Sequence, residues 1–178
     1  HLTRCSSAAR RKRHALELEP SALPVIAPTL PMPLVIFVCL MLIALTTLIH
    51  YEVLRGLSSG LPRLAIPGRS KLLIVMLAAF VAHTLEIGLY GLALFVMVRY
   101  LGVGSLSSPG GFSLVDCLYF SAETYTSVGF GDLVPTGPVR LLAGAEALNG
   151  LLLIGWSASY AYIAMERYWT AGNADPRS

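Results

Sequence analysis

Residues 126–132 read Thr-Ser-Val-Gly-Phe-Gly-Asp, and the glycines Gly129 and Gly131 alternate there with the apolar residues Val128 and Phe130. Glycine permits backbone angles that other residues avoid, and it leaves the space beside the backbone free of a side chain. An isolated Gly-Phe-Gly would be an ordinary turn. The surroundings of the stretch decide between a turn and a specialised backbone.

Three apolar segments accompany this stretch, at residues 34–49, 72–98 and 139–165. Each is near or above the roughly 20 residues that a helix needs to cross the hydrocarbon core of a bilayer. The chain is 55% hydrophobic and only 13% charged, whereas an ordinary soluble domain has about 25% charged residues. Three such helices would leave too few residues to surround them in water. The predicted fold class is therefore an all-α membrane protein.

The N-terminal part divides into three regions. Residues 1–33 are basic and rich in proline, which excludes a continuous helix, so a disordered extension is expected. Residues 34–54 form one additional hydrophobic helix, and residues 55–70 form a short basic loop that is expected on the cytoplasmic side. The helix over 71–99 then runs from inside to outside.

One conflict arises if the segment 34–49 crosses the membrane, because the basic residues between positions 4 and 13 would then lie outside, against the positive-inside bias. Three explanations remain open. Translation could begin at Met32, which would remove these charges. The segment could be an interfacial or re-entrant helix with both ends inside. A cleaved signal sequence is the third, although no small-residue cleavage pattern follows the apolar run.

A short helix is predicted directly before the quoted stretch. Residues 101–112 are rich in Gly and Ser and indicate an extracellular loop. Ser113 and Asp116 have the spacing of a capping box, which opens a helix over 114–126 that is too short to span a bilayer. Its C-terminal carbonyls would favour a cation. The backbone of 127–132 could then replace the hydration oxygens of an ion, in a place where non-helical backbone is tolerated at membrane depth.

Residues 121–132, Ser-Ala-Glu-Thr-Tyr-Thr-Ser-Val-Gly-Phe-Gly-Asp, resemble the pore loop of potassium channels and are similar to that of the small bacterial two-span, proton-gated type. The resemblance covers roughly 72–165. It implies a homotetramer around one pore, with 71–99 as outer helix, 138–166 as inner helix and 167–178 as a short cytoplasmic tail. The implied function is passive, selective K+ conduction. The implied ion-binding residues of the selectivity filter are Thr126, Ser127, Val128, Gly129, Phe130 and Gly131.

The resemblance also implies a supporting role for three residues behind the filter, Tyr119, Glu123 and Asp132. Two close carboxylates titrate as a pair, so Glu123 and Asp132 are expected to share a proton. The family more often has Trp at position 119, Thr at position 127 and Tyr at position 130. Because Phe130 lacks a hydroxyl, we expect a weaker tie between the filter and its surroundings.

Two features of the flanking helices are further candidates. Gly150 is a candidate gating hinge, and it could equally be small so that two helices approach closely. The other feature is a pair of polar residues on one face of each long helix, which predicts a buried polar cluster behind the short helix. Its role would be structural or that of a proton or divalent-cation sensor. The cluster comprises His83, Glu86, Glu146 and Asn149.

The sequence disfavours several other functions. Basic residues gather near the predicted membrane ends, so lipid headgroups are expected as partners and nucleic acid is not. The sequence has no H-E-x-x-H motif, so no enzyme and no small-molecule substrate are indicated. No cofactor is expected apart from K+ as the permeant ion. The rivals are a non-selective cation channel and a non-conducting membrane sensor subunit. A bacterial plasma (inner) membrane is the expected location.

Overall fold

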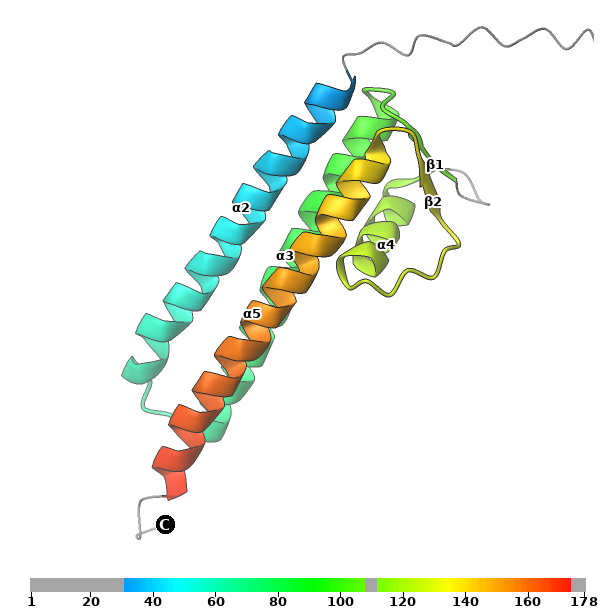
Figure 1. Ribbon diagram of the computed structural model, residues 1–178. Helices are drawn as coiled ribbons and strands as arrows, with labels where there is room; N and C mark the ends of the chain where they lie inside the picture. Colours follow the sequence, from blue (N-terminus) through cyan, green and yellow to red (C-terminus); the bar gives the residue numbers. More distant parts are fainter. Residues whose placement is uncertain (1–30, 108–111, 174–178) are drawn as a thin grey trace, which may run out of the picture.

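Three long helices lie side by side in the computed structural model, which describes residues 31–107 and 112–173 (Figure 1). They are α2 (Pro31–Gly60), α3 (Gly68–Arg99) and α5 (Val139–Asn173). Each is long and apolar enough to cross a membrane. A shorter helix, α4 (Leu114–Tyr125), lies beside the upper half of α3 and α5. The predicted all-α membrane architecture is confirmed, with one small β ribbon added to it.

Helix α2 runs along most of the length of the bundle (Figure 1). It starts at the end of the bundle where α3 ends, and its own last residues lie at the opposite end. A helix with both ends on one side of the membrane does not fit this arrangement. The N-terminal extension lies outside the described residues, so the other two explanations of its charge remain predictions.

The predicted boundary of the first helix is wrong at its C-terminal end. Residues 55–60, placed by the sequence in the basic loop, continue α2, and the 3-10 turn η1 (Leu61–Arg63) follows. Leu57 and Leu61 are buried against Val75 of α3 and Ala164 of α5, and this packing extends the helix through its polar Ser58-Ser59 pair. The basic connection is therefore short. The last long helix is also longer than predicted, since α5 continues to Asn173.

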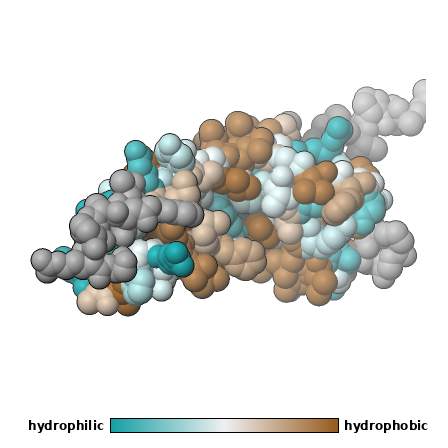
Figure 2. All heavy atoms as spheres, turned by 90° about the horizontal axis from the view of Figure 1, so that it is seen from below, coloured by the Kyte–Doolittle hydropathy of each residue, from teal (hydrophilic) through white to brown (hydrophobic). Residues whose placement is uncertain are grey.

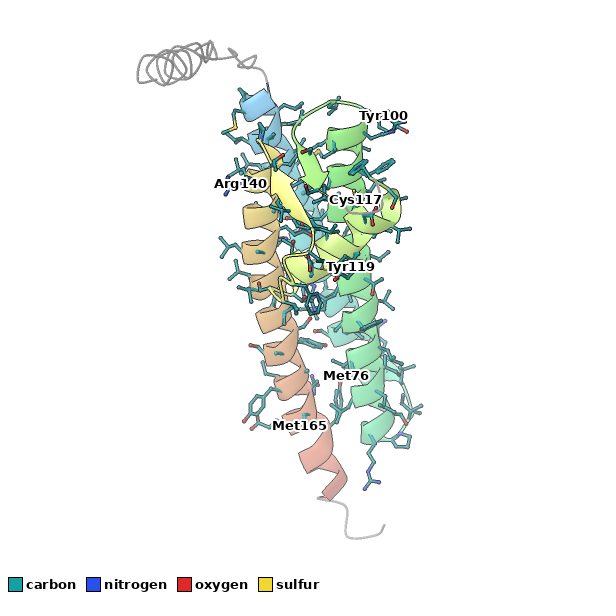
Figure 3. All side chains as sticks on the ribbon, turned by 90° about the vertical axis from the view of Figure 1, so that its right-hand side faces the viewer. Met76, Tyr100, Cys117, Tyr119, Arg140 and Met165 are labelled. Carbon is teal, nitrogen blue, oxygen red and sulfur yellow. The ribbon has the colours of Figure 1, made fainter. Side chains whose placement is uncertain are left out.

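The predicted start of the short helix is confirmed. The Ser113 side chain accepts a hydrogen bond of 3.2 Å from the Asp116 amide, and the Ser113 amide donates to Asp116 Oδ2 at 3.0 Å. This capping box satisfies amides that the first turn leaves without helical partners. Figure 3 shows α4 with Cys117 and Tyr119, well away from Met76 and Met165 at the other end of the bundle.

Two glycines let the long helices approach α4. A Cβ atom on Gly91 of α3 would lie 3.1 Å from Leu118 Cα, and a Cβ on Gly150 of α5 would lie only 2.2 Å from the Tyr125 carbonyl oxygen. Real Cβ atoms do not approach a backbone oxygen so closely. Because neither position carries a side chain, α4 can lie close against both α3 and α5.

A two-stranded antiparallel ribbon follows the quoted stretch, and the sequence had indicated only a loop there. Strand β1 (Ser105–Ser107) pairs with β2 (Val134–Thr136), with Ser105 opposite Thr136. Strands of three residues carry no periodic pattern that could reveal them. The ribbon joins the segment after α3 to the segment before α5.

The outer surface of the bundle is largely apolar (Figure 2). Large side chains such as Phe37, Leu73 and Phe80 are each more than 60% exposed. A soluble monomer rarely shows such a surface, which suits lipid tails or a neighbouring subunit. Inside, a core of buried residues joins all four helices, for example Leu42, Tyr90, Tyr125 and Leu142.

Candidate functional site

The backbone between α4 and β2 alternates between two conformations. Ser127, Gly129 and Gly131 have positive φ angles of 59°, 55° and 79°, and the intervening residues Val128 and Phe130 do not. In a β-strand successive amides point to opposite sides, whereas alternation of right- and left-handed residues turns neighbouring amides to one side. Ser127 pays about 1–2 kcal/mol for the left-handed conformation. The surrounding contacts must supply that energy.

Glu123 supplies these contacts with both its backbone and its side chain. Its carbonyl oxygen accepts hydrogen bonds from the amides of Val128 at 2.9 Å and Gly129 at 3.3 Å. Its carboxylate Oε2 accepts from the Phe130 amide at 3.0 Å. Glu123 is only 5% exposed. One residue of α4 therefore holds three successive amides of the stretch.

The carbonyl oxygens of the same stretch have a different environment. Among the described residues, no backbone amide donates to a carbonyl of residues 127–131. Val128 is 56% exposed and Phe130 is 70% exposed, and a Cβ on Gly129 or Gly131 would meet no atom within 4 Å. Backbone carbonyls need a partner. The face opposite Glu123 is thus open and offers a row of unpaired oxygens.

The end of α4 adds negative potential to this row. The helix ends at Tyr125, directly before the stretch, so the negative end of its dipole lies beside the carbonyls. The Thr126 hydroxyl donates to the Ala122 carbonyl at 2.7 Å. The Thr126 hydroxyl is therefore already engaged with α4. Together these groups can bind a dehydrated cation.

Tyr119 lies next to Phe130. The ring of Tyr119 stacks on the ring of Phe130, with centroids 6.5 Å apart and planes 5° apart. Desolvation, followed by the charges of Asp132 and Glu123, raises the pKa of Tyr119. Asp132 Oδ1 accepts from the Leu133 amide at 3.1 Å. Within the described residues, no hydrogen bond joins the carboxyl groups of Glu123 and Asp132, so their shared proton stays a prediction.

We expect Glu123→Val to lower the thermal stability of the protein, because it leaves the Phe130 amide without its acceptor. Such a loss costs about 1–3 kcal/mol, which corresponds to a fall of several degrees in Tm for a chain of this size. Glu123→Gln keeps an acceptor oxygen and should lose less than half as much. Thermal unfolding of the purified protein in detergent measures both. Equal Tm values for Glu123→Val and the wild type would show that the hydrogen bond from the Phe130 amide to Glu123 does not stabilise the protein.

The four residues predicted to form one buried polar cluster fall into separate hydrogen-bonded groups. Glu146 accepts from the Ser121 hydroxyl, and Asn149 Nδ2 donates to Thr46 Oγ1 at 2.8 Å and to the Tyr90 hydroxyl at 3.2 Å. His83 and Glu86 instead belong to a second network. Thus the structure does not bring the four predicted residues together, because Glu146, Asn149 and the pair of His83 and Glu86 each have different partners.

The second network contains three residues that the sequence analysis did not include. His50 Nδ1 lies 2.9 Å from Glu86 Oε1, and His83 Nδ1 lies 3.1 Å from Glu86 Oε2. Tyr125 donates its hydroxyl hydrogen to Glu86, and Ser157 lies between the two imidazoles. The sequence feature that could have revealed His50 is its polar side chain at the end of an otherwise apolar segment. The nitrogen and oxygen atoms of His50, His83 and Glu86 lie within 4.8 Å of one another, which a metal ion would also require.

Gly150 serves the close approach of two helices. The 2.2 Å distance from its hypothetical Cβ to the Tyr125 oxygen leaves no room for a side chain. This favours the packing role over the hinge role, which stays a prediction. The contact places α5 directly behind the last residue of α4.

Comparisons with known proteins agree with this geometry. Residues 72–167 match a protein-family model described as "Ion channel". The inward rectifier potassium channel Kirbac3.1 of Paramagnetospirillum magnetotacticum is 38% identical over 90 residues, which are 47% of this chain and 30% of that protein. Two-pore potassium channel 1 of Arabidopsis thaliana is 43% identical over 63 residues, which are 35% of this chain and 17% of that protein. The matched part spans less than a third of either relative. No solved structure matches the chain.

Proposed function

Since the chain belongs to the ion-channel family, we propose that it is a potassium-selective channel subunit that conducts K+ passively as a homotetramer. The family is not a class of enzymes, and three apolar helices make the chain a multi-pass membrane protein. The ion selectivity, the assembly and the roles of single residues are the proposal.

The row of unpaired carbonyls carries this proposal. The amides of residues 127–130 donate to Thr124 and Glu123 of α4, and no amide among the described residues donates to a carbonyl of residues 127–131. One chain supplies only a quarter of a ring that could replace the hydration shell of an ion. Four copies around a closed symmetry axis would complete the ring. The exposed apolar residues Leu148 and Leu152 of α5 suit contact with neighbouring subunits or lipid.

Selectivity for K+ over Na+ is supported by two observations. The two relatives are described as potassium channels. The aromatic position of the filter holds Phe130, which stacks on Tyr119, whereas non-selective members of the resembled family often carry Asp there. In this proposal the Ser127 hydroxyl lies at the innermost ion site, and the backbone oxygens of 127–131 form the others.

The remaining parts of the proposal concern the surroundings. Tyr119, Glu123 and Asp132 support the filter from behind. Lipid surrounds the bundle, and the location is the plasma membrane of a bacterium. No cofactor is needed for a passive pore, because the ion moves down its own gradient.

The reversal potential tests the proposed function. The purified protein is reconstituted in a planar bilayer with K+ on one side and Na+ on the other. We expect current that reverses near the K+ limit. Reversal near zero would favour a non-selective cation channel, and a protein that stays silent over the full range of pH and voltage would favour a sensor subunit. Cross-linking in the same membranes should give a tetramer as the largest product.

A further inference from the structure

One hydrogen-bond network joins α2 to the three helices of the pore region. It comprises His50 of α2, His83 and Glu86 of α3, Tyr125 of α4 and Ser157 of α5. His50 and Glu86 are completely buried, and His83 is 18% exposed. His50 lies outside the residues that match the family. The network ends at Tyr125, whose neighbour Thr126 begins the filter.

The hydrogens of this network can be counted from its contacts. Glu86 is in contact with His50 Nδ1, His83 Nδ1 and the Tyr125 hydroxyl, and His83 Nδ1 also lies 3.0 Å from the Tyr125 oxygen. When both Nδ1 atoms carry hydrogens, Glu86 accepts three hydrogen bonds and the His83 hydrogen is shared with Tyr125. Both Nε2 atoms lie 3.1 Å from Ser157 Oγ. A serine hydroxyl has one hydrogen and can donate it to one nitrogen only. The other Nε2 must then carry a hydrogen itself, which makes that imidazole positively charged.

The count gives the same total for every arrangement of the hydrogens. If Glu86 is protonated and donates to His50 Nδ1, the neutral His50 donates from Nε2 to Ser157. In both arrangements the network holds one hydrogen more than a carboxylate with two neutral imidazoles. With it, every contact has a donor and the net charge is zero. Without it, the net charge is −1 and two lone pairs face each other at one contact of the network.

We propose that these residues form a binding site for one exchangeable proton, which fastens α2 to the base of the pore helix and thereby controls the filter. The inference rests on the proposed channel function. Proton release weakens the ties of α2 and α3 to α5 and leaves a buried uncompensated charge, which is costly. Tyr125 then loses part of its support. Conduction is therefore highest when the proton is bound.

The groups around the site agree with a bound proton. The titratable side chains that α2 and α3 contribute to the network are His50 on α2 and His83 and Glu86 on α3. Helix α4 contributes Tyr125, and α5 contributes Ser157. The indole of Trp156 on α5 lies 5.6 Å from the His50 ring, close enough for a cation–π interaction with an imidazolium. Glu146 of α5 is bonded to Ser121 and takes no part.

A divalent cation fits the same side chains less well. It would displace the hydrogens between the imidazoles and Glu86, and its two charges would leave the buried group with a net charge of +1. A proton leaves the net charge at zero. The low dielectric of the interior favours the neutral state. In addition, every nitrogen and oxygen of the network already has a side-chain partner.

The substitution Glu86→Gln isolates the proton. Its amide oxygen can accept from Tyr125 and His83, and its NH2 group can donate to His50 Nδ1. His50 Nε2 then donates to Ser157, and Ser157 donates to His83 Nε2. All contacts are satisfied by neutral groups, so no exchangeable proton remains. The matched control is Glu146→Gln, which neutralises another buried carboxylate, on the neighbouring helix α5.

The experiment measures two properties at about pH 6 and about pH 8.5, on either side of the range in which an imidazole exchanges its proton, with a chelator present. The first is K+ flux into liposomes, and the second is the Tm of the purified protein. Between these pH values we expect the wild-type flux to fall about tenfold and the Tm to fall by about 5 °C. Glu86→Gln should remove both changes, so that its flux and its Tm at both pH values resemble those of the wild type at the lower pH. Glu146→Gln should keep both changes.

The two readouts separate this inference from the proposed function. If no variant conducts, but the pH dependence of Tm disappears in Glu86→Gln alone, the proton site stands and the channel function fails. Selective flux with a pH dependence that survives in Glu86→Gln, or that disappears in Glu146→Gln, would overturn the proton site. A wild-type flux that rises with pH would also overturn it. Removal of the pH effect by the chelator alone would assign the site to a metal ion instead.

Discussion

Gly129→Ala is expected to abolish selective K+ flux while the protein still folds and assembles. Gly129 has a φ of 55°, a conformation that costs an alanine about 1–2 kcal/mol. Four subunits share one pore, so the cost per channel is about 4–8 kcal/mol, or at least a hundredfold loss of the conducting conformation. A Cβ at this position would meet no other atom within 4 Å. The effect therefore acts on the backbone conformation and not on packing.

The measurement is K+ flux into liposomes, together with Tm and cross-linking to verify folding and assembly. Gly88→Ala is the matched control, because Gly88 lies inside α3 and its added Cβ would also meet no atom within 4 Å. The control should conduct like the wild type. Wild-type selectivity and flux in Gly129→Ala would show that the left-handed backbone at this position is not needed for conduction.

The part of the fold that local sequence encodes could be predicted. The capping box of Ser113 and Asp116 defines the start of α4 within the residues that make it. The alternation of glycines before Asp132 permits the positive φ angles that the structure has at Gly129 and Gly131. Both patterns are short-range, so no knowledge of tertiary contacts was needed.

The extent of α2 could not be predicted from local composition. Ser58 and Ser59 favour a helix end, but their hydroxyls bond back to the carbonyls of Leu54 and Arg55 within the helix. Burial of Leu57 and Leu61 against α3 and α5 then decides the boundary. Tertiary packing overrides the local preference here.

The proton network was hidden for the same reason. His50 and Ser157 are 107 positions apart in the sequence, and His83 and Tyr125 are 42 apart. The pair His83 and Glu86 was visible because it lies within one turn of one helix. Only the register between four helices brings the other members together. For Glu146 and Asn149 the same register selected Ser121, Thr46 and Tyr90 as partners.

Gly150→Ala is expected to lower both the stability of the protein and its K+ flux. The added Cβ would lie 2.2 Å from the carbonyl oxygen and 2.9 Å from the carbonyl carbon of Tyr125. Both are backbone atoms, so α4 and α5 must move apart. Overpacking of this kind costs about 1–3 kcal/mol. The displaced residue directly precedes the filter, so we expect the flux to fall about tenfold or more.

The same substitution distinguishes the packing role of Gly150 from the hinge role. If Gly150 were only a hinge, alanine would stiffen α5 and stabilise the helix by about 1 kcal/mol, so the Tm would rise while channel opening became rarer. If it is a packing position, the Tm falls together with the flux. Gly144→Ala on the same helix is the control, since its Cβ would meet no atom of the subunit within 4 Å. A raised Tm with reduced opening in Gly150→Ala, beside a raised Tm with unchanged flux in Gly144→Ala, would assign the hinge and reject the packing argument.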